Sequence, residues 1–169
     1  LQGLPQPASE LAAVLFSVVI PTLNRPERLK RCLLHLSQVR FPASQFEVIV
    51  VDDGSACSLD SSLPRLANFR LLRQANAGPG AARNFGARQA QGRYLVFLDD
   101  DCVVDRAWLG DYARAFETDP DALWGGKILT CKTQNIYCQV AQWVADTVDQ
   151  VFNSDPSSAR FFTSNNFAM

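Results

Sequence analysis

The sequence predicts an α/β domain in which a mostly parallel sheet is flanked by helices. Strand-like runs alternate with helix-like segments from residue 16 to about residue 150, which is the pattern of repeated β-α-β units. Residues 94–98 are apolar without alternation, as expected for a strand buried on both faces. Three adjacent carboxylates, Asp99, Asp100 and Asp101, follow this strand directly. Since open α/β sheets bind ligands at the carboxyl ends of their strands, the triplet marks a candidate site.

The composition indicates one globular domain with no basic excess. The 169 residues are 47% hydrophobic and 20% charged, which is enough for one real core. The 16 basic and 17 acidic residues give a net charge of −1, so a nucleic-acid partner is not expected. The apolar run at residues 11–20 is too short to span a bilayer, and no basic segment of a signal peptide precedes it. The five cysteines lack CxxC spacing, which favours reduced thiols in a cytoplasmic protein.

The chain is expected to open with a leader, a strand and a helix. Residues 1–15 include prolines and a glycine, so we expect a flexible leader before a single domain at residues 16–169. Residues 16–20 predict the first strand, which Pro21 is expected to end. A helix with Pro26 near its first position follows, with apolar residues at helical spacing. We expect the basic residues on its other face to be solvated: Arg28, Lys30 and Arg31.

The next elements bring further polar groups to strand ends. Residues 46–51 predict a second strand, which runs into the acid pair Asp52-Asp53 and a glycine turn. A weak helix at residues 58–67 and a short strand at residues 69–72 come next. Residues 76–86 are rich in small residues and open a helix, so this backbone can approach an anionic ligand closely.

After the acidic triplet the sequence predicts two helices and two strands. Asp105 is a plausible N-cap for a helix whose aromatic residues, four apart, face the core. A strand broken by glycines is expected at residues 122–130, and a helix at residues 137–151. Residues 161–169 begin as a strand. Parallel strands put the polar ends that follow residues 20, 51 and 98 at one edge of the sheet, where they and the glycine-rich segment predict a nucleotide site with a metal.

Four segments together identify a resemblance. In order and spacing they resemble family 2 of the inverting glycosyltransferases, whose GT-A fold is built on a Rossmann-like sheet. Any one of these motifs alone is weak, whereas the set of four is specific. The resemblance covers residues 16–169, and its motifs are residues 18–25, 50–55, 76–86 and 97–101.

The resemblance implies a nucleotide-sugar donor, often a UDP-sugar, and a metal. Asp101 would ligate Mn²⁺ or Mg²⁺ on the diphosphate, Asp100 would face the ribose and sugar, and Asp99 could share either role. Asp52 would hydrogen-bond the base. The other residues that the resemblance assigns to the nucleotide-sugar site are Pro21, Thr22, Asn24, Arg25, Asp53, Asn76, Gly78 and Arg83.

The resemblance also implies an acceptor substrate and a general base. It implies transfer with inversion to a glycan or lipid-linked acceptor in cell-envelope polysaccharide biosynthesis, with peripheral membrane association of the full-length protein. The family's general base lies in a later acidic motif, which we expect beyond Met169. We therefore expect the domain to be truncated at its C-terminal end and this fragment to transfer little sugar by itself.

Three alternatives to a glycosyltransferase make different demands on the sequence. A nucleotidyltransferase would carry a glycine-rich loop after the first strand, and residues 21–25 contain no glycine. An NAD-dependent dehydrogenase requires GxGxxG at that point, whereas the glycines here follow the third strand. A non-catalytic module that only binds a nucleotide-sugar remains an alternative, because no general base is recognised in these 169 residues.

Overall fold

A computed structural model describes residues 14–59, 63–64, 67–129, 136–155, 159, 163 and 165–169. The expected leader at residues 1–15 therefore lies almost entirely outside the described residues. The helices are α1 (Pro26–Leu36), α2 (Pro79–Arg88), α3 (Trp108–Thr118) and α4 (Ile136–Phe152), with a 3-10 turn at Ala43–Gln45. The strands are β1 (Phe16–Thr22), β2 (Phe46–Asp52), β3 (Phe69–Arg73), β4 (Tyr94–Leu98), β5 (Trp124–Gly125) and β6 (Asn166–Ala168).

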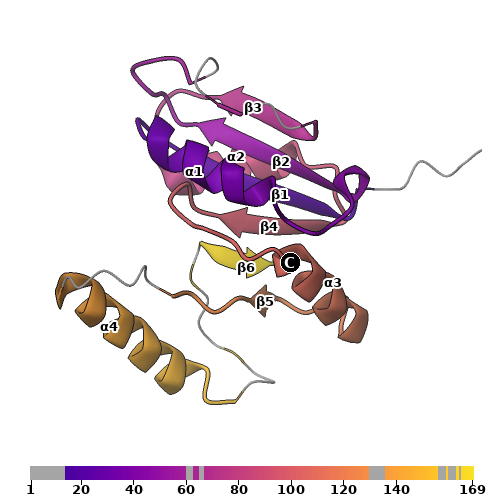
Figure 1. Ribbon diagram of the computed structural model, residues 1–169, viewed down its shortest axis with the longest axis vertical. Coiled ribbons are helices and arrows are strands. Elements are labelled where there is room, and N and C mark those ends of the chain that lie inside the picture. Colours follow the sequence, from indigo (N-terminus) through magenta and orange to yellow (C-terminus); the bar gives the residue numbers. More distant parts are fainter. Residues whose placement is uncertain are drawn as a thin grey trace, which may run out of the picture.

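Within the described residues the strands form one sheet in the order β3-β2-β1-β4-β6-β5 (Figure 1). The pairs β1–β2, β1–β4 and β2–β3 are parallel, so the carboxyl ends of these four strands lie at one edge. β6 is antiparallel to both β4 and β5. The predicted fold class, a mostly parallel sheet flanked by helices, is confirmed.

Helices cover both faces of the parallel part of the sheet (Figure 1). On one face, alternate residues of β1, β2 and β4 pack with α1 and α3 in the main core. On the other face, Ile49 and Val51 of β2 pack against Ala82 of α2. The aromatic residues expected to face the core in α3 do so: Phe116 stacks on Tyr94, with ring centroids 3.7 Å apart. Two packed layers of helices thus hold the sheet edge that carries the polar strand ends.

Pro21 does not end the first strand, contrary to expectation. β1 continues through Pro21 to Thr22, paired with β2 in the register Pro21↔Val51 and Thr22↔Asp52. Pairing with β4 stops earlier, at Val19↔Phe97. Beyond Val19 the strand is therefore paired on one side only, and a proline without an N–H is tolerated at such a local edge.

Several other local expectations are corrected by the tertiary structure. α3 begins at Trp108 rather than next to Asp105, because the Asp105 carboxylate accepts a hydrogen bond from the Ala107 N–H in a turn before the helix. The described part of residues 58–67 contains no helix, and the remainder lies outside the described residues. The strand expected at residues 122–130 is reduced to β5, and the strand expected at residues 161–169 is described only as β6.

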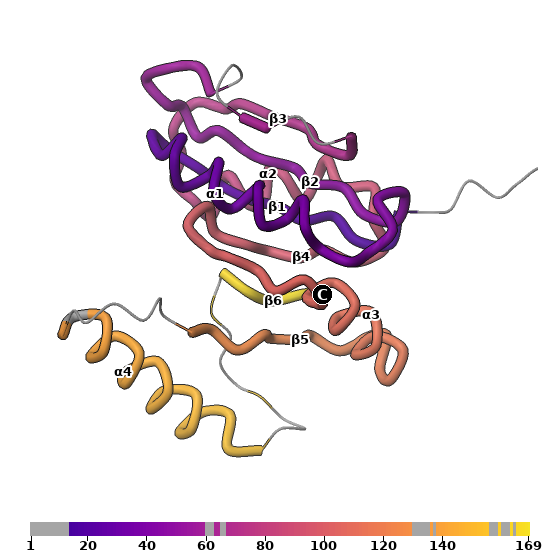
Figure 2. The backbone as a smooth tube through the Cα atoms, in the orientation of Figure 1, coloured from indigo at the N-terminus to yellow at the C-terminus, as the bar shows by residue number. Residues whose placement is uncertain are grey.

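The last described strand returns to the middle of the fold although it lies far from β4 in sequence (Figure 2). Phe167 of β6 pairs with Phe97 of β4, and their rings stack at 4.8 Å. Asn166 accepts hydrogen bonds from Trp108 Nε1 at 3.0 Å and from the Tyr112 hydroxyl at 2.9 Å, which ties β6 to α3. β6 therefore extends the sheet beside β4, the strand that leads into the acidic triplet.

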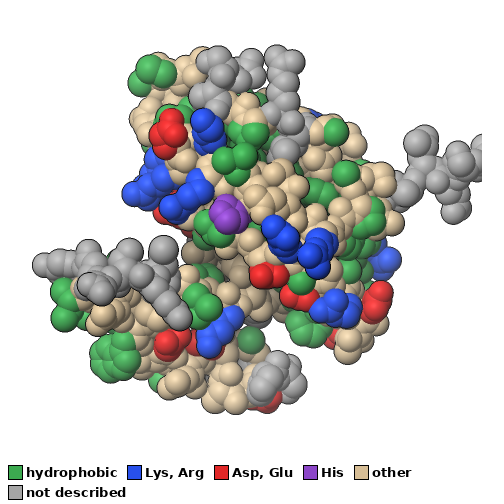
Figure 3. Space-filling view, in the orientation of Figure 1, with side chains coloured by type: hydrophobic (Ala, Val, Ile, Leu, Met, Phe, Trp, Pro, Cys, Tyr) green, Lys and Arg blue, Asp and Glu red, His purple; other side chains and the backbone are tan. Residues whose placement is uncertain are grey.

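α4 differs from the other helices in leaving its apolar residues in solvent. It lies away from the parallel sheet in Figure 1, and Figure 3 shows hydrophobic side chains gathered over it. Trp143 is 70% exposed. No helix in the described part of the chain is both long and apolar enough to cross a bilayer. The other exposed apolar residues of α4 are Ile136, Val140, Val144, Val151 and Phe152.

The close approach of α2 to the sheet predicts the effect of a methyl group at Gly86. A Cβ there would lie 2.5 Å from Val19 Cγ1 and 3.0 Å from Val51 Cγ2, and both side chains belong to packed strands. We expect Gly86→Ala to lower the free energy of unfolding by about 1–3 kcal/mol in urea denaturation, because overpacking outweighs the gain in helix propensity.

Gly80→Ala, in the same helix, is the matched control. No atom lies within 4 Å of a Cβ at Gly80. Its free energy of unfolding should stay constant or rise by up to about 1 kcal/mol. Equal effects of the two substitutions would contradict the packing argument.

Candidate ligand-binding site

A cavity of about 600 Å³ opens at the sheet edge where the parallel strands end. It brings together residues that follow β1, β2 and β4 and the segment that opens α2, as the sequence predicted. A second, more open hollow of about 690 Å³ lies between the end of α1 and residues 103–107, away from these strand ends. The cavity at the strand ends is lined by Pro21, Thr22, Leu23, Arg25, Asp53, Asn76, Gly78, Pro79, Arg83, Asp99, Asp100 and Asp101.

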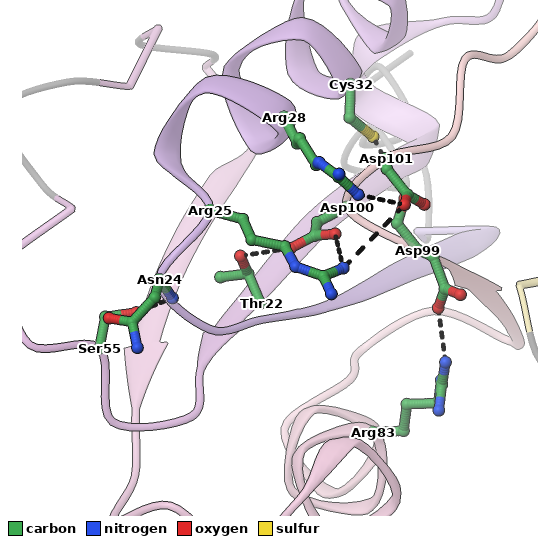
Figure 4. Close-up of polar contacts among 10 residues, drawn as sticks. All are labelled: Thr22, Asn24, Arg25, Arg28, Cys32, Ser55, Arg83, Asp99, Asp100 and Asp101. Carbon is green, nitrogen blue, oxygen red and sulfur yellow. Dashed lines mark hydrogen bonds and ion pairs between the residues drawn. The ribbon is translucent and has the colours of Figure 1, made fainter.

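The acidic triplet occupies the centre of the site, and its three carboxylates face different partners (Figure 4). Asp100 is only 4% exposed; the Thr22 hydroxyl donates to its Oδ2 at 2.7 Å, and Arg25 Nη1 lies 3.5 Å from its Oδ1. Asp99 accepts a hydrogen bond from Arg83 on α2. The parallel pairing of β1 with β4 places Thr22 beside the end of β4, and the Thr22 hydroxyl therefore reaches Asp100.

Asp101 points toward α1, whereas Asp100 contacts Thr22 on β1. Arg28 Nη1 donates to its Oδ2 at 3.0 Å, and Arg25 Nη1 lies 4.0 Å from the same oxygen. Arg28 was expected to be solvated, so sequence reasoning missed this contact. The available signal was its spacing: Arg25 and Arg28 are three residues apart and therefore share one side of the first turns of the helix.

Burial and these neighbours act on the triplet in opposite directions. Burial raises the pKa of Asp100, and the Thr22 hydroxyl and Arg25 offset this only in part. The nearby Asp101 carboxylate raises it further. A carboxylate that is costly to keep ionised favours any cation brought into the site.

Asp53 fastens the glycine-rich segment to the end of β2. It is 2% exposed, and its Oδ1 accepts from Gln74 Nε2 at 2.7 Å and from the Ala77 N–H at 2.9 Å. Its Oδ2 accepts from the Gly78 N–H at 2.8 Å. Gly78 has a φ of 91°, a conformation that a side chain disfavours. Burial raises the pKa of Asp53, but these three hydrogen bonds outweigh it and leave the pKa below its ordinary value.

Two residues expected in the site, Asp52 and Asn24, do not line the cavity. Asp52 is buried, accepts the Ser55 N–H at 2.8 Å, and pairs with Arg73 at 3.5 Å. The Asn24 N–H donates to Ser55 Oγ, and the Asn24 Oδ1 accepts from the Ala56 N–H. Both therefore shape the loop after β2. Conversely, Leu23 and Pro79 line the cavity and were not singled out in the sequence.

The donor set at Asp101 fits a hard divalent cation that is completed by ligand oxygens. Of the three carboxylates, Asp101 is the most open, with 40% of its side chain exposed, and its Oδ2 already faces the guanidinium groups of Arg25 and Arg28. The described residues hold no group of three or more His, Cys, Asp or Glu that could bind a metal by themselves. Mg²⁺ and Mn²⁺ sites often use one or two carboxylates together with phosphate oxygens, and this arrangement suits them.

Comparison with known protein families gives a match over most of the chain. The model of "Glycosyl transferase family 2" matches residues 17–167. The chain is 35% identical over 106 residues to the poly(ribitol-phosphate) beta-N-acetylglucosaminyltransferase TarS of Staphylococcus aureus, which covers 58% of this chain and 18% of that protein. It is also 35% identical over 98 residues to the glycosyltransferase AglE of Haloferax volcanii, which covers 55% of this chain and 32% of AglE.

Solved structures give the same answer. The crystal structure of S. aureus TarS 1–349 in complex with UDP-GlcNAc superimposes with a TM-score of 0.59 at 27% identity, over 71% of this chain and 39% of that chain. The chain thus spans between about a fifth and two fifths of the length of these relatives.

The hydrogen bonds of Asp53 predict a specific effect of Asp53→Asn. The amide would place an NH₂ group against the Gly78 N–H or, if flipped, against Gln74 and Ala77. We expect the free energy of unfolding at pH 7 to fall by about 1–3 kcal/mol. Asp121→Asn, at an exposed position, is the control and should change it little.

The pH dependence gives a second readout of the same variant. Because the folded pKa of Asp53 is lowered, its ionised form stabilises the fold at every pH above the unfolded-state value of about 3.9. This contribution is lost as the pH falls through the folded pKa. The difference between wild type and Asp53→Asn in denaturant titrations should therefore shrink below about pH 4. A difference that is constant from pH 7 to pH 3 would refute the assignment.

Proposed function

The chain belongs to glycosyl transferase family 2, and on this basis we propose that its cavity binds a nucleotide-sugar donor, most simply a UDP-sugar, for transfer to an acceptor hydroxyl. The observation that carries the proposal is the cavity itself, where the acidic triplet, the Asp53-anchored segment and Arg25 meet. Relatives in this family transfer sugars from nucleotide-sugar donors, and the TarS structure with UDP-GlcNAc supports the choice of a uridine donor.

The geometry supports a division of labour within the donor site. Residues of the β1 end and Asp53 form the side on which we place the base and ribose. Asp100, held by Thr22, is buried deeply enough to make directional hydrogen bonds to sugar or ribose hydroxyls. Arg83 and the start of α2 face the triplet from the other side, where a diphosphate gains both positive charge and a helix N-terminus.

We place Mn²⁺ or Mg²⁺ at Asp101. The bound cation would stabilise the negative charge on the leaving diphosphate. Asp99 belongs to the same triplet, and its pairing with Arg83 would keep a guanidinium close to the same phosphates. Two cationic groups beside the leaving group would lower the barrier by electrostatic stabilisation, provided that they are held in place before the reaction.

We propose transfer with inversion, which requires a base on the acceptor side. A sugar hydroxyl is a very weak acid, so a positioned carboxylate is needed to take its proton. Among the described residues that line the cavity, every carboxylate already has a cationic or hydrogen-bonding partner. We therefore expect the base to come from residues outside this set.

The acceptor and the setting are proposals that follow from the relatives. TarS is named for a poly(ribitol-phosphate) acceptor, which supports a glycan or lipid-linked acceptor in cell-envelope polysaccharide biosynthesis. A cytoplasmic catalytic domain with peripheral membrane association of the full-length protein would suit such an acceptor.

Nucleotide binding tests the proposal directly. We expect UDP with Mn²⁺ or Mg²⁺, at about a hundred times its Kd, to raise the melting temperature of the 169-residue chain by about 5–10 °C, because a ligand of the folded state stabilises it. Differential scanning fluorimetry against UDP, GDP, ADP and CDP, each with and without metal, measures this. No shift with any nucleoside diphosphate at millimolar concentration would reject a nucleotide-sugar site.

The proposed metal ligand is tested by Asp101→Ala. We expect UDP affinity, measured by calorimetry, to become independent of Mn²⁺, while the fold keeps its stability because lost ion pairs and relieved repulsion offset each other. Asp111→Ala on α3 is the matched control, since Asp111 also pairs with a surface arginine but lies outside the cavity. Retained metal dependence in Asp101→Ala would place the cation elsewhere.

A further inference from the structure

Among the described residues, three arginines pair with the triplet, and Arg28 is the one that does not line the cavity. It reaches over from α1 and donates to Asp101 Oδ2, the same oxygen that Arg25 approaches from the side of Asp100 (Figure 4). Arg25 is farther from that oxygen, at 4.0 Å, and lies closer to Asp100, at 3.5 Å. Arg28 is therefore the main neutralising partner of Asp101 in the ligand-free protein.

A guanidinium and a divalent cation cannot share this oxygen at low cost. A Mg²⁺ ion binds a carboxylate oxygen at about 2.0–2.1 Å, whereas the Arg28 nitrogen now lies 3.0 Å from the same atom. The metal ion and the guanidinium groups of Arg25 and Arg28 would then lie within a few ångströms of each other. In a partly dehydrated site the repulsion between these cations is poorly screened. A metal that binds at this oxygen thus requires Arg28 to move away or Asp101 to turn.

Arg28 is able to leave without creating a buried unpaired charge. Its side chain is 58% exposed and sits on a long, flexible stem, so water can solvate the released guanidinium. The buried carboxylate, Asp100, does not depend on it, because Thr22 and Arg25 hold Asp100. An ion pair of this exposure is weak, which suits a contact that is made and broken in each binding cycle.

From these contacts we propose that Arg28 competes with the divalent cation for Asp101: it closes the metal position in the ligand-free domain and moves away when metal and nucleotide bind. Arg28 is thus a positioning residue that sets the metal concentration at which the sugar donor binds. The inference rests on the function proposed above and adds a residue that this function does not itself require.

Calorimetric titration of UDP at a series of Mn²⁺ concentrations tests it in the 169-residue chain. Arg28→Ala should lower the half-saturating Mn²⁺ concentration by about two- to five-fold, the size expected from losing a partly exposed ion pair. Arg31→Ala is the matched control, because it removes the same charge from an exposed position on α1. Within the described residues, Arg31 itself makes no ion pair. It should leave that concentration close to the wild-type value.

Ionic strength gives an independent readout. Salt screens exposed ion pairs, so the gap between wild type and Arg28→Ala should narrow between 50 mM and 500 mM NaCl. Circular dichroism melts establish that both variants fold. A half-saturating Mn²⁺ concentration in Arg28→Ala equal to that in Arg31→Ala, or higher than in wild type, overturns the inference while leaving the nucleotide site intact. Absence of any UDP binding in wild type would instead reject the proposed function itself.

Discussion

Electrostatic repulsion within the triplet Asp99-Asp100-Asp101 is the constraint on which the rest of this site depends. Three adjacent carboxylates at the end of a buried strand cannot stay ionised without compensation. The fold supplies it by sending each carboxylate in a different direction: one to α2, one to β1 and one to α1. Three elements that are distant in sequence are thereby tied to the end of β4. The same demand for positive charge makes this edge suited to a metal cation, which could in turn bind a diphosphate.

Compensation by arginine also explains why the site can be stable before it is filled. A guanidinium satisfies a carboxylate by hydrogen bonds, yet at a partly exposed position it contributes little net stability and can be exchanged for another cation. The buried member of the triplet is held differently, by a hydroxyl and a neighbouring arginine. The site thus combines a fixed inner part with an outer part that can rearrange when a ligand arrives.

Membership of family 2 gives these features a context. The described chain contains the carboxyl edge of the parallel strands together with the segment that opens α2, and the cavity in which we propose that a sugar donor binds lies there. Asp53 links the two halves of this edge, because it bonds the backbone of residues 77 and 78 from the end of β2. A buried carboxylate of this kind acts on the shape of the pocket and on protein stability together.

Several features could be derived from the sequence because they depend on local pattern. Alternation of strands and helices gave the fold class, and the rule that ligands lie at strand ends placed Thr22, Arg25, Asp53 and the triplet in one site. Apolar spacing located α4 to within one residue at each end, and Pro26 marked the start of α1. Four motifs in order were enough to predict the family.

The tertiary structure alone decided which partner each polar group meets. The Arg28–Asp101 pair joins residues 73 positions apart, and Asp52 faces the inside of a loop while its neighbour Asp53 lines the cavity. Pro21 stays within β1 because one side of the strand is unpaired there, and β6 inserts antiparallel beside β4. Such outcomes depend on contacts between segments that the sheet brings together. No local spacing encodes them, since the energy of each contact depends on what lies opposite in space.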